Sequence, residues 1–264
     1  MRIVTWNVNS VRLRINAARR LIRQFQPDVL CLQETKVADE HFPTAPFVKL
    51  GYPHIALAGQ KAYHGVALIS RLPLGNVERL TWCGRRDGRH LMATLPGGIE
   101  VHNFYVPAGG DLPDPARNDK FAHKLDFVAE VTDWFAAHRT PADRIVLVGD
   151  LNIAPLETDV WSHKQLLRVV SHTPVEVAAM ARWRASLDWV DAVRKFTPES
   201  EKLYSWWSYR SPNWAKANKG RRLDHIWVTP ALDPALVGAE VVAKLRGWAT
   251  PSDHVPVVVD LGAD

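Results

Sequence analysis

The sequence predicts a four-layer α/β sandwich, in which two stacked mixed β-sheets are flanked by helices. Apolar segments with strand character are more numerous than segments with helical periodicity. Short strand-like segments follow one another through residues 53–106, where a doubly wound parallel sheet would need crossover helices. The 264 residues contain no low-complexity segment and no long linker. We therefore expect one α/β domain that spans residues 1–264.

Strands are expected where apolar runs of strand length are bounded by turn-forming or polar residues. Gly and Pro separate the runs within residues 53–106, which indicates antiparallel pairing through short turns. Apolar runs near the carboxyl terminus repeat the pattern. The segments that meet this description are 2–10, 28–36, 64–70, 89–95, 99–106, 144–150, 222–229, 238–245 and 254–261.

Helices are expected in three segments whose apolar residues recur at spacings of three and four. Ser10 is placed to cap the first of them, which follows it directly. The second spans about residues 115–138 and has Phe121 and Leu125 on its apolar side. The third runs through residues 173–196. We expect these helices to cover the outer faces of the sheets.

The composition is that of a soluble globular protein with a mild basic excess. Lys and Arg number 33 against 28 Asp and Glu, which gives a net charge of +5. That excess favours a polyanionic partner only weakly. Cys31 and Cys83 belong to no metal-binding or redox motif, which is typical of a reducing compartment. No apolar stretch approaches the ~18 residues of a membrane helix. We expect a cytoplasmic monomer, associated with the nucleoid when bound to DNA, with no membrane partner.

Strand after strand in this sequence ends in small polar or acidic residues. Such groups are costly to bury without a purpose. If the strands lie side by side, their polar ends converge on one rim. The residues at these ends are Asn7, Asn9, Glu34, Tyr105, Asp150, Asn152, Asp224, Asp253 and His254.

These residue types suit one particular chemistry. Carboxylate and amide oxygens are ligands for Mg²⁺ or Mn²⁺ rather than for zinc. A histidine beside aspartates can stabilise a phosphorane-like oxyanion, and a second carboxylate can activate a water molecule. Each strand end taken alone is also typical of an ordinary turn. The complete set favours metal-assisted hydrolysis of a phosphate ester.

The chain closely resembles the exonuclease III family of AP endonucleases, within the DNase I-like endonuclease/exonuclease/phosphatase superfamily. The resemblance extends from residue 3 to residue 258, and its motifs occur in the order of the family. Together they are far more specific than any one of them. The motifs are TWNVNSVR, PDVLCLQETK, YHGVALIS, NFYVPAGG, VGDLNIAP, WWSYR, RRLDHIWV and PSDHVPV.

The resemblance implies a metal site at four of the strand ends. Glu34 corresponds to the main metal carboxylate of the family. Asn7 and Asn9 would lie near the metal ion or its water molecules. Asp253 corresponds to a second acidic residue near the metal. The implied cofactor is Mg²⁺, with Mn²⁺ as the alternative.

The resemblance also implies the roles of the catalytic residues. Asp150 would activate the attacking water, and Asn152 would hold that water or a phosphate oxygen through its amide. Tyr105 would donate a hydrogen bond to the scissile phosphate. His254 would bind a phosphate oxygen, with Asp224 as its orienting carboxylate.

The aromatic and basic stretch after residue 203 implies how DNA is held. Trp206 corresponds to the aromatic residue that lines the pocket for a flipped, baseless sugar. Arg210, Arg221 and Arg222 flank this stretch and are expected to hold the duplex backbone. Two positions depart from familiar relatives. Ala108 stands where they have a polar residue and Arg221 where they have a bulky apolar one, so contacts with an abasic site are expected to differ from those of the relatives.

The expected function is that of an Mg²⁺-dependent DNA repair phosphodiesterase. It would cleave the backbone 5′ to abasic sites in double-stranded DNA and remove nucleotides from 3′ ends. One alternative is another phosphodiesterase or phosphatase of the superfamily, or a non-specific nuclease. The other alternative is a DNA-binding protein without catalysis, although no expected catalytic position is substituted. The role of segment 160–176 stays open.

Overall fold

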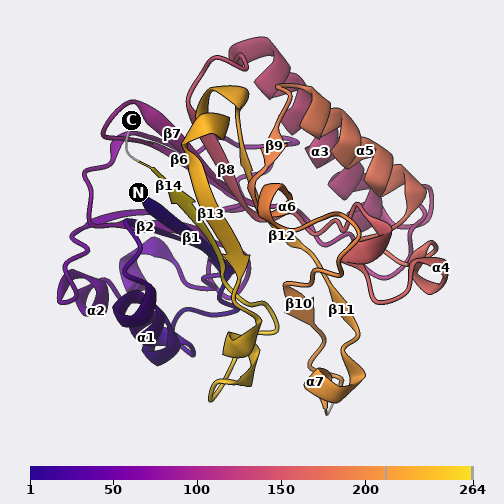
Figure 1. Ribbon diagram of the computed structural model, residues 1–264, viewed down its shortest axis with the longest axis horizontal. Coiled ribbons are helices and arrows are strands. Elements are labelled where there is room, and N and C mark those ends of the chain that lie inside the picture. The colour runs from indigo at the N-terminus through magenta and orange to yellow at the C-terminus, as the bar shows by residue number, and fades with distance from the viewer. Residues whose placement is uncertain (212, 263–264) are drawn as a thin grey trace.

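The structure, a computed structural model, describes residues 1–211 and 213–262, and two mixed β-sheets form its centre (Figure 1). The strands are β1 (Arg2–Asn7), β2 (Val29–Gln33), β3 (His54–Ala58), β4 (Val66–Ser70), β5 (Gly75–Glu78), β6 (His90–Leu95), β7 (Ile99–Tyr105), β8 (Ile145–Asp150), β9 (Val190–Asp191), β10 (Trp206–Trp207), β11 (Gly220–Arg221), β12 (Asp224–Val228), β13 (Leu236–Val241) and β14 (Val257–Leu261).

Each large sheet has six strands and contains both parallel and antiparallel pairs. The first has the order β13-β14-β1-β2-β4-β3 and the second the order β5-β6-β7-β8-β12-β9. β1 runs parallel to β2 and β7 runs parallel to β8, whereas β12 is antiparallel to β8. A small two-stranded sheet of β10 and β11 projects below them (Figure 1). The predicted pair of stacked mixed sheets is confirmed.

Helices cover the two outer faces of the sheets (Figure 1). Helices α1 and α2 lie on one side of the molecule, and α3 and α5 lie on the other. None of the described helices is both long and apolar enough to cross a membrane. The helices are α1 (Ile15–Phe25), α2 (Ala45–Val48), α3 (Asp119–His138), α4 (His163–Leu166), α5 (Pro174–Ala185), α6 (Ala192–Phe196) and α7 (Trp214–Ala217), with 3-10 turns η1 (Asp39–His41), η2 (Glu157–Asp159), η3 (Pro230–Ala235) and η4 (Ala243–Gly247).

Alternation along the strands divides the core into layers. On β1, Ile3 belongs to the cluster between the two sheets, and Val4 belongs to the cluster beneath α1 and α2. On β8, Val148 joins the central cluster, whereas Leu147 packs with Phe127 of α3. Successive side chains of a strand point to opposite faces, so both faces of each sheet are buried. This arrangement confirms the predicted four-layer sandwich.

The three expected helices differ from the observed ones in detail. Ser10 does not cap α1, because it lies at φ 83° and Arg14 is the residue at the N-cap. The expected helix at 173–196 is interrupted, since α5 ends at Ala185 and strand β9 precedes α6. In α3, Leu125 is only half-buried, and the inward position is taken by Lys124.

Candidate active site

The polar residues predicted at strand ends lie together where the two sheets meet. Asn7 is the last residue of β1, and Glu34 directly follows β2, so the first sheet supplies both. Asp150 ends β8 in the second sheet, where it pairs with Tyr105 of β7 and with Asp224 of β12. The site is therefore built from both sheets at one edge of the sandwich.

Asn7 joins the two sheets through its side-chain amide. Its Nδ2 atom donates to Oε1 of Glu34 at 2.8 Å and to Oδ2 of Asp150 at 2.8 Å. Both N–H groups of the amide are thereby used. Asn7 itself is fully buried, and its amide holds the two carboxylates at a set separation.

Unusual backbone conformations place the site residues. Gly149 has φ 142°, and a Cβ atom there would lie 1.9 Å from the carbonyl oxygen of Phe104 on the neighbouring strand. Only glycine therefore fits directly before Asp150. Glu34 and Asn152 adopt φ 51° and φ 53°, in the left-handed region. Strain of this kind tends to collect at functional sites.

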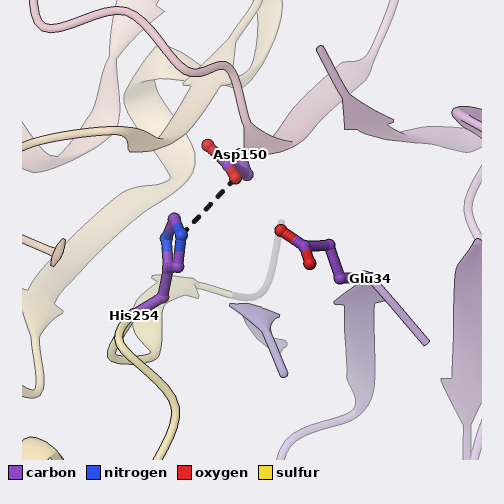
Figure 2. A group of neighbouring side chains, drawn as sticks. All are labelled: Glu34, Asp150 and His254. Carbon is purple, nitrogen blue, oxygen red and sulfur yellow. Dashed lines mark ion pairs between the residues drawn. The ribbon is translucent and has the colours of Figure 1, made fainter. Parts of the chain in front are cut away.

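Glu34, Asp150 and His254 surround a candidate metal site, in which the two carboxylates are the ligands and the imidazole of His254 lies beside them. One ligand atom from each of them lies within 4.8 Å of the others (Figure 2). In Figure 2 the three side chains point towards one another from separate elements, and an ion pair of 3.7 Å joins His254 Nε2 to Asp150 Oδ2. Carboxylate oxygens of this type suit a hard divalent cation.

His254 is oriented by Asp224 behind it. Its Nδ1 atom lies 2.8 Å from Oδ2 of Asp224, and that same oxygen accepts a bond of 2.6 Å from the Ser205 hydroxyl. Burial lowers the pKa of His254, but the charges of Asp224 and Asp150 outweigh burial and raise it. The imidazole is therefore held in its charged form, with Nε2 facing the site.

The buried negative charge of the carboxylates favours a bound cation at this site. Burial raises the pKa of Asp150, and the charges of Asp224 and Glu34 add to that effect, while His254 and Asn7 oppose it. In Glu34, burial is outweighed by hydrogen bonds from Asn7 and Lys36, which lower the pKa. A divalent cation would offset the buried negative charge, so the donor set fits such an ion.

Tyr105 and Asn152 line the same site from β7 and from the turn after β8. Burial, together with the charges of Glu34 and Asp150, raises the pKa of Tyr105, so its hydroxyl stays protonated and can donate a hydrogen bond. Asn152 Nδ2 donates to the carbonyl of Val106 at 2.9 Å. Within the described part of the chain its second N–H makes no hydrogen bond, so it can donate to a ligand.

Asn9 and Asp253 form the rim beside the carboxylate cluster. Asn9 Nδ2 donates to Asp253 Oδ1 at 3.0 Å, and Asn9 Oδ1 accepts from Lys36 Nζ at 2.6 Å. The other oxygen of Asp253 accepts from the indole of Trp206 at 3.0 Å. Asp253 thus accepts hydrogen bonds from protein donors on both oxygens and does not belong to the cluster of Glu34, Asp150 and His254.

A cavity of about 860 Å³ opens over this cluster. It joins the acidic metal centre to a basic and aromatic wall from the β10–β11 hairpin and from segment 160–176. Asn7, Asp224 and Arg222 are buried behind the lining, and the half-buried Asn9 lies beside it. The predicted site residues that line the cavity are Glu34, Tyr105, Asp150, Asn152, Trp206, Arg210, Arg221, Asp253 and His254.

The strand-end residues described above lie in a region that matches a known protein family. The model of the Endonuclease/Exonuclease/phosphatase family matches residues 4–254. This chain belongs to that family. The match includes all the strand ends described above, which agrees with the resemblance found in the sequence.

Individual relatives cover 97% or more of this chain. Exodeoxyribonuclease III of Haemophilus influenzae is 33% identical over 97% of this chain and 98% of its own length. The structure of an AP endonuclease from Archaeoglobus fulgidus superposes with a TM-score of 0.92 at 30% identity, with 100% of both chains covered. A 3′-5′ exonuclease from Neisseria meningitidis gives a TM-score of 0.90 at 31% identity, again over 100% of both chains.

The prediction that Arg222 contacts DNA is wrong. Arg222 is only 1% exposed. Its guanidinium pairs with Asp159 at 2.8 Å and with Asp191 at 2.7 Å. It therefore stabilises the core next to β12 through these ion pairs and cannot reach DNA. Arg221, one position earlier, faces the cavity, and Arg210 is exposed at its rim.

The sequence analysis missed a buried ion pair behind the site. Lys124 Nζ lies 2.5 Å from Glu176 Oε1, and it also donates to the carbonyl of Asn152 at 2.7 Å. Glu176 in turn accepts from the backbone N–H of Ser171 at 2.9 Å. The signal for this pair was a lone lysine on the apolar stripe of α3. These bonds connect segment 160–176, whose role the sequence did not indicate, to the turn that carries Asn152.

Proposed function

We propose that this protein is a divalent-metal-dependent DNA repair phosphodiesterase. It cleaves the backbone 5′ to abasic sites and removes nucleotides from 3′ ends. The metal is Mg²⁺, with Mn²⁺ as a substitute. One observation carries the proposal: Glu34, Asp150 and His254 lie together in the lining of a cavity that basic and aromatic side chains also line.

The donor set supports direct attack of water on phosphorus. Asp150 accepts the proton of the water, since it is buried and its charge is destabilised by neighbouring carboxylates. His254, charged and held by Asp224, donates to a phosphate oxygen as negative charge develops there. Glu34 would hold a divalent cation, which would supply Lewis-acid polarisation of the phosphate. Tyr105 and Asn152 donate the remaining hydrogen bonds.

The composition of the cavity supports DNA over a small phosphate ester. Trp206 offers an apolar face on which the sugar of an extruded nucleotide can pack. Arg210 and Lys219 are exposed beside it and are placed to contact backbone phosphates. The relatives named above, an exodeoxyribonuclease III, an AP endonuclease and a 3′-5′ exonuclease, support the same substrate.

A gel assay tests this function. One duplex contains a single tetrahydrofuran abasic analogue, and a matched duplex is intact with blunt ends. Each is incubated with protein and Mg²⁺, with Mn²⁺, or with EDTA. We expect a cut 5′ to the analogue and slower shortening of the intact 3′ end, both abolished by EDTA.

The same assay separates the competing functions. Hydrolysis of inositol phosphates or sphingomyelin with no cut at the analogue would replace the proposal by another chemistry of the superfamily. Cleavage at random positions in both duplexes would indicate a non-specific nuclease. Saturated binding with no cleavage in either metal would indicate a DNA-binding protein without catalysis.

A further inference from the structure

Arg221 lines the same cavity as the candidate metal site. It pairs with Trp206 across the β10–β11 hairpin, and Trp206 in turn bridges to His254. Two strand spacings therefore separate the backbones of Arg221 and His254, or about 10 Å. Residues directly opposite in a hairpin project to the same face, so Arg221 and Trp206 face the cavity together.

The guanidinium of Arg221 is held in a defined place. Its Nη1 atom donates to the carbonyl of Val170 at 2.9 Å and to the Ser171 hydroxyl at 2.7 Å. Its Cζ atom lies 5.4 Å from the centre of the Trp206 ring. Because two hydrogen bonds and the Trp206 ring hold the guanidinium, its charge does not sample the solvent freely, as an ordinary surface arginine would.

The charge of Arg221 has no acidic partner. Among the described residues its guanidinium forms no ion pair, and both atoms that accept its hydrogen bonds are neutral. The acidic side chain that acts on it, Glu176, is already engaged by Lys124, Ser171 and Thr173. A half-buried guanidinium without a carboxylate is a site for an anion from outside the chain.

We propose that Arg221 forms a second anion-binding subsite, which takes a phosphate group one nucleotide away from the phosphate that reacts at the metal centre. The inference rests on the proposed function, because it assumes a polynucleotide in the cavity. The sugar between the two phosphates would lie on Trp206, which stands between Asp253 and Arg221. The phosphate is either an internucleotide linkage or a free 3′-terminal group.

A binding cycle in EDTA tests the subsite without any requirement for catalysis. Fluorescence anisotropy measures the dissociation constant of an abasic-analogue duplex whose phosphate 3′ to the analogue is natural or is a neutral methylphosphonate. We expect neutralisation to weaken binding by the wild type about tenfold, and by Arg221→Leu less than twofold. Equal weakening of both proteins would overturn the proposal.

Control variants exclude a trivial loss of folding or of general affinity. Arg221→Lys keeps the charge and should recover part of the discrimination between the two linkages. Arg210→Leu removes an exposed charge from the same cavity and should weaken both duplexes by the same factor. Circular dichroism checks that each variant is folded. If Arg210→Leu alone abolished discrimination, Arg221 would not be the subsite.

A kinetic arm distinguishes the two sources of the phosphate. Nicked duplexes that end in 3′-hydroxyl or 3′-phosphate are compared with the abasic duplex in Mg²⁺. A loss in Arg221→Leu confined to the 3′-phosphate end assigns the subsite to terminal groups, and a loss confined to the abasic duplex assigns it to the linkage. An equal loss on all three substrates contradicts the subsite. Failure of the wild type to cut any of them would instead reject the proposed function.

Discussion

The carboxylate of Asp224 and the imidazole of His254 lie 2.8 Å apart in the buried wall of the site. They come from different sheets, because Asp224 begins β12 and His254 lies just before β14. This pair fixes which nitrogen of His254 faces the substrate. Asp224→Asn should therefore lower kcat by about 10²-fold, with little change in KM. Steady-state kinetics on the abasic duplex measure both constants.

Asp260→Asn serves as the matched control, since Asp260 lies on β14 and pairs with Arg2 away from the cavity. Its kcat should stay within about twofold of the wild type. A normal kcat in Asp224→Asn would show that His254 needs no orienting carboxylate.

Asp150→Asn should lower turnover by about 10³-fold while leaving the dissociation constant for DNA nearly unchanged. The amide keeps the size of the carboxylate but cannot accept the proton of water. Single-turnover kinetics and anisotropy separate the two effects. Turnover close to normal would remove Asp150 from the step that activates water.

Glu34→Gln should raise the Mg²⁺ concentration needed for half-maximal activity at least tenfold. The carboxylate of Glu34 is one of the two at the candidate metal site, and its substitution removes charge from that site. A metal titration of activity measures the shift. Glu40→Gln, on the exposed turn η1, is the control and should not alter the titration. An unchanged titration in Glu34→Gln would reject the ligand assignment.

Lys124→Met should destabilise the fold by about 3–5 kcal/mol, because it leaves the buried carboxylate of Glu176 without its cation. Urea denaturation measures the free energy of unfolding. The double variant Lys124→Met with Glu176→Gln should lose less than the sum of the two single variants. Strict additivity would show that the two side chains do not interact.

Stability should fall between about pH 6.5 and pH 4 because of His225. Burial is the main cause that lowers the pKa of this imidazole, to about 4, from an ordinary value of 6.5. The unfolded chain binds the proton first as pH falls, so the folded state loses up to about 3 kcal/mol across this window.

His225→Gln removes this titration and keeps a donor for the carbonyl of Ile153, which His225 contacts at 2.8 Å. The free energy of unfolding is compared at pH 7 and pH 5 for both proteins. The variant should lose less stability on acidification than the wild type. Parallel losses would place the pH dependence in other groups, such as His90 and His102.

The local sequence pattern predicted most strands of the fold. Apolar runs that end in polar residues marked most strands of both sheets, because burial on both faces leaves a signature in each strand. The same strand ends marked Glu34, Asp150 and His254, whose residue types already indicate a hard cation. The interruption between α5 and α6 was missed, since helical spacing continues across the turn near Asp188.

Only the tertiary structure determines where the side chains of Arg221 and Arg222 point. Sequence reasoning placed Arg221 and Arg222 together on DNA. The pairing of Arg221 with Trp206 turns one guanidinium into the cavity, and the neighbouring side chain of Arg222 must then point into the core. Local sequence carries the alternation of side chains, but only the register between distant strands decides which member of the pair faces the substrate.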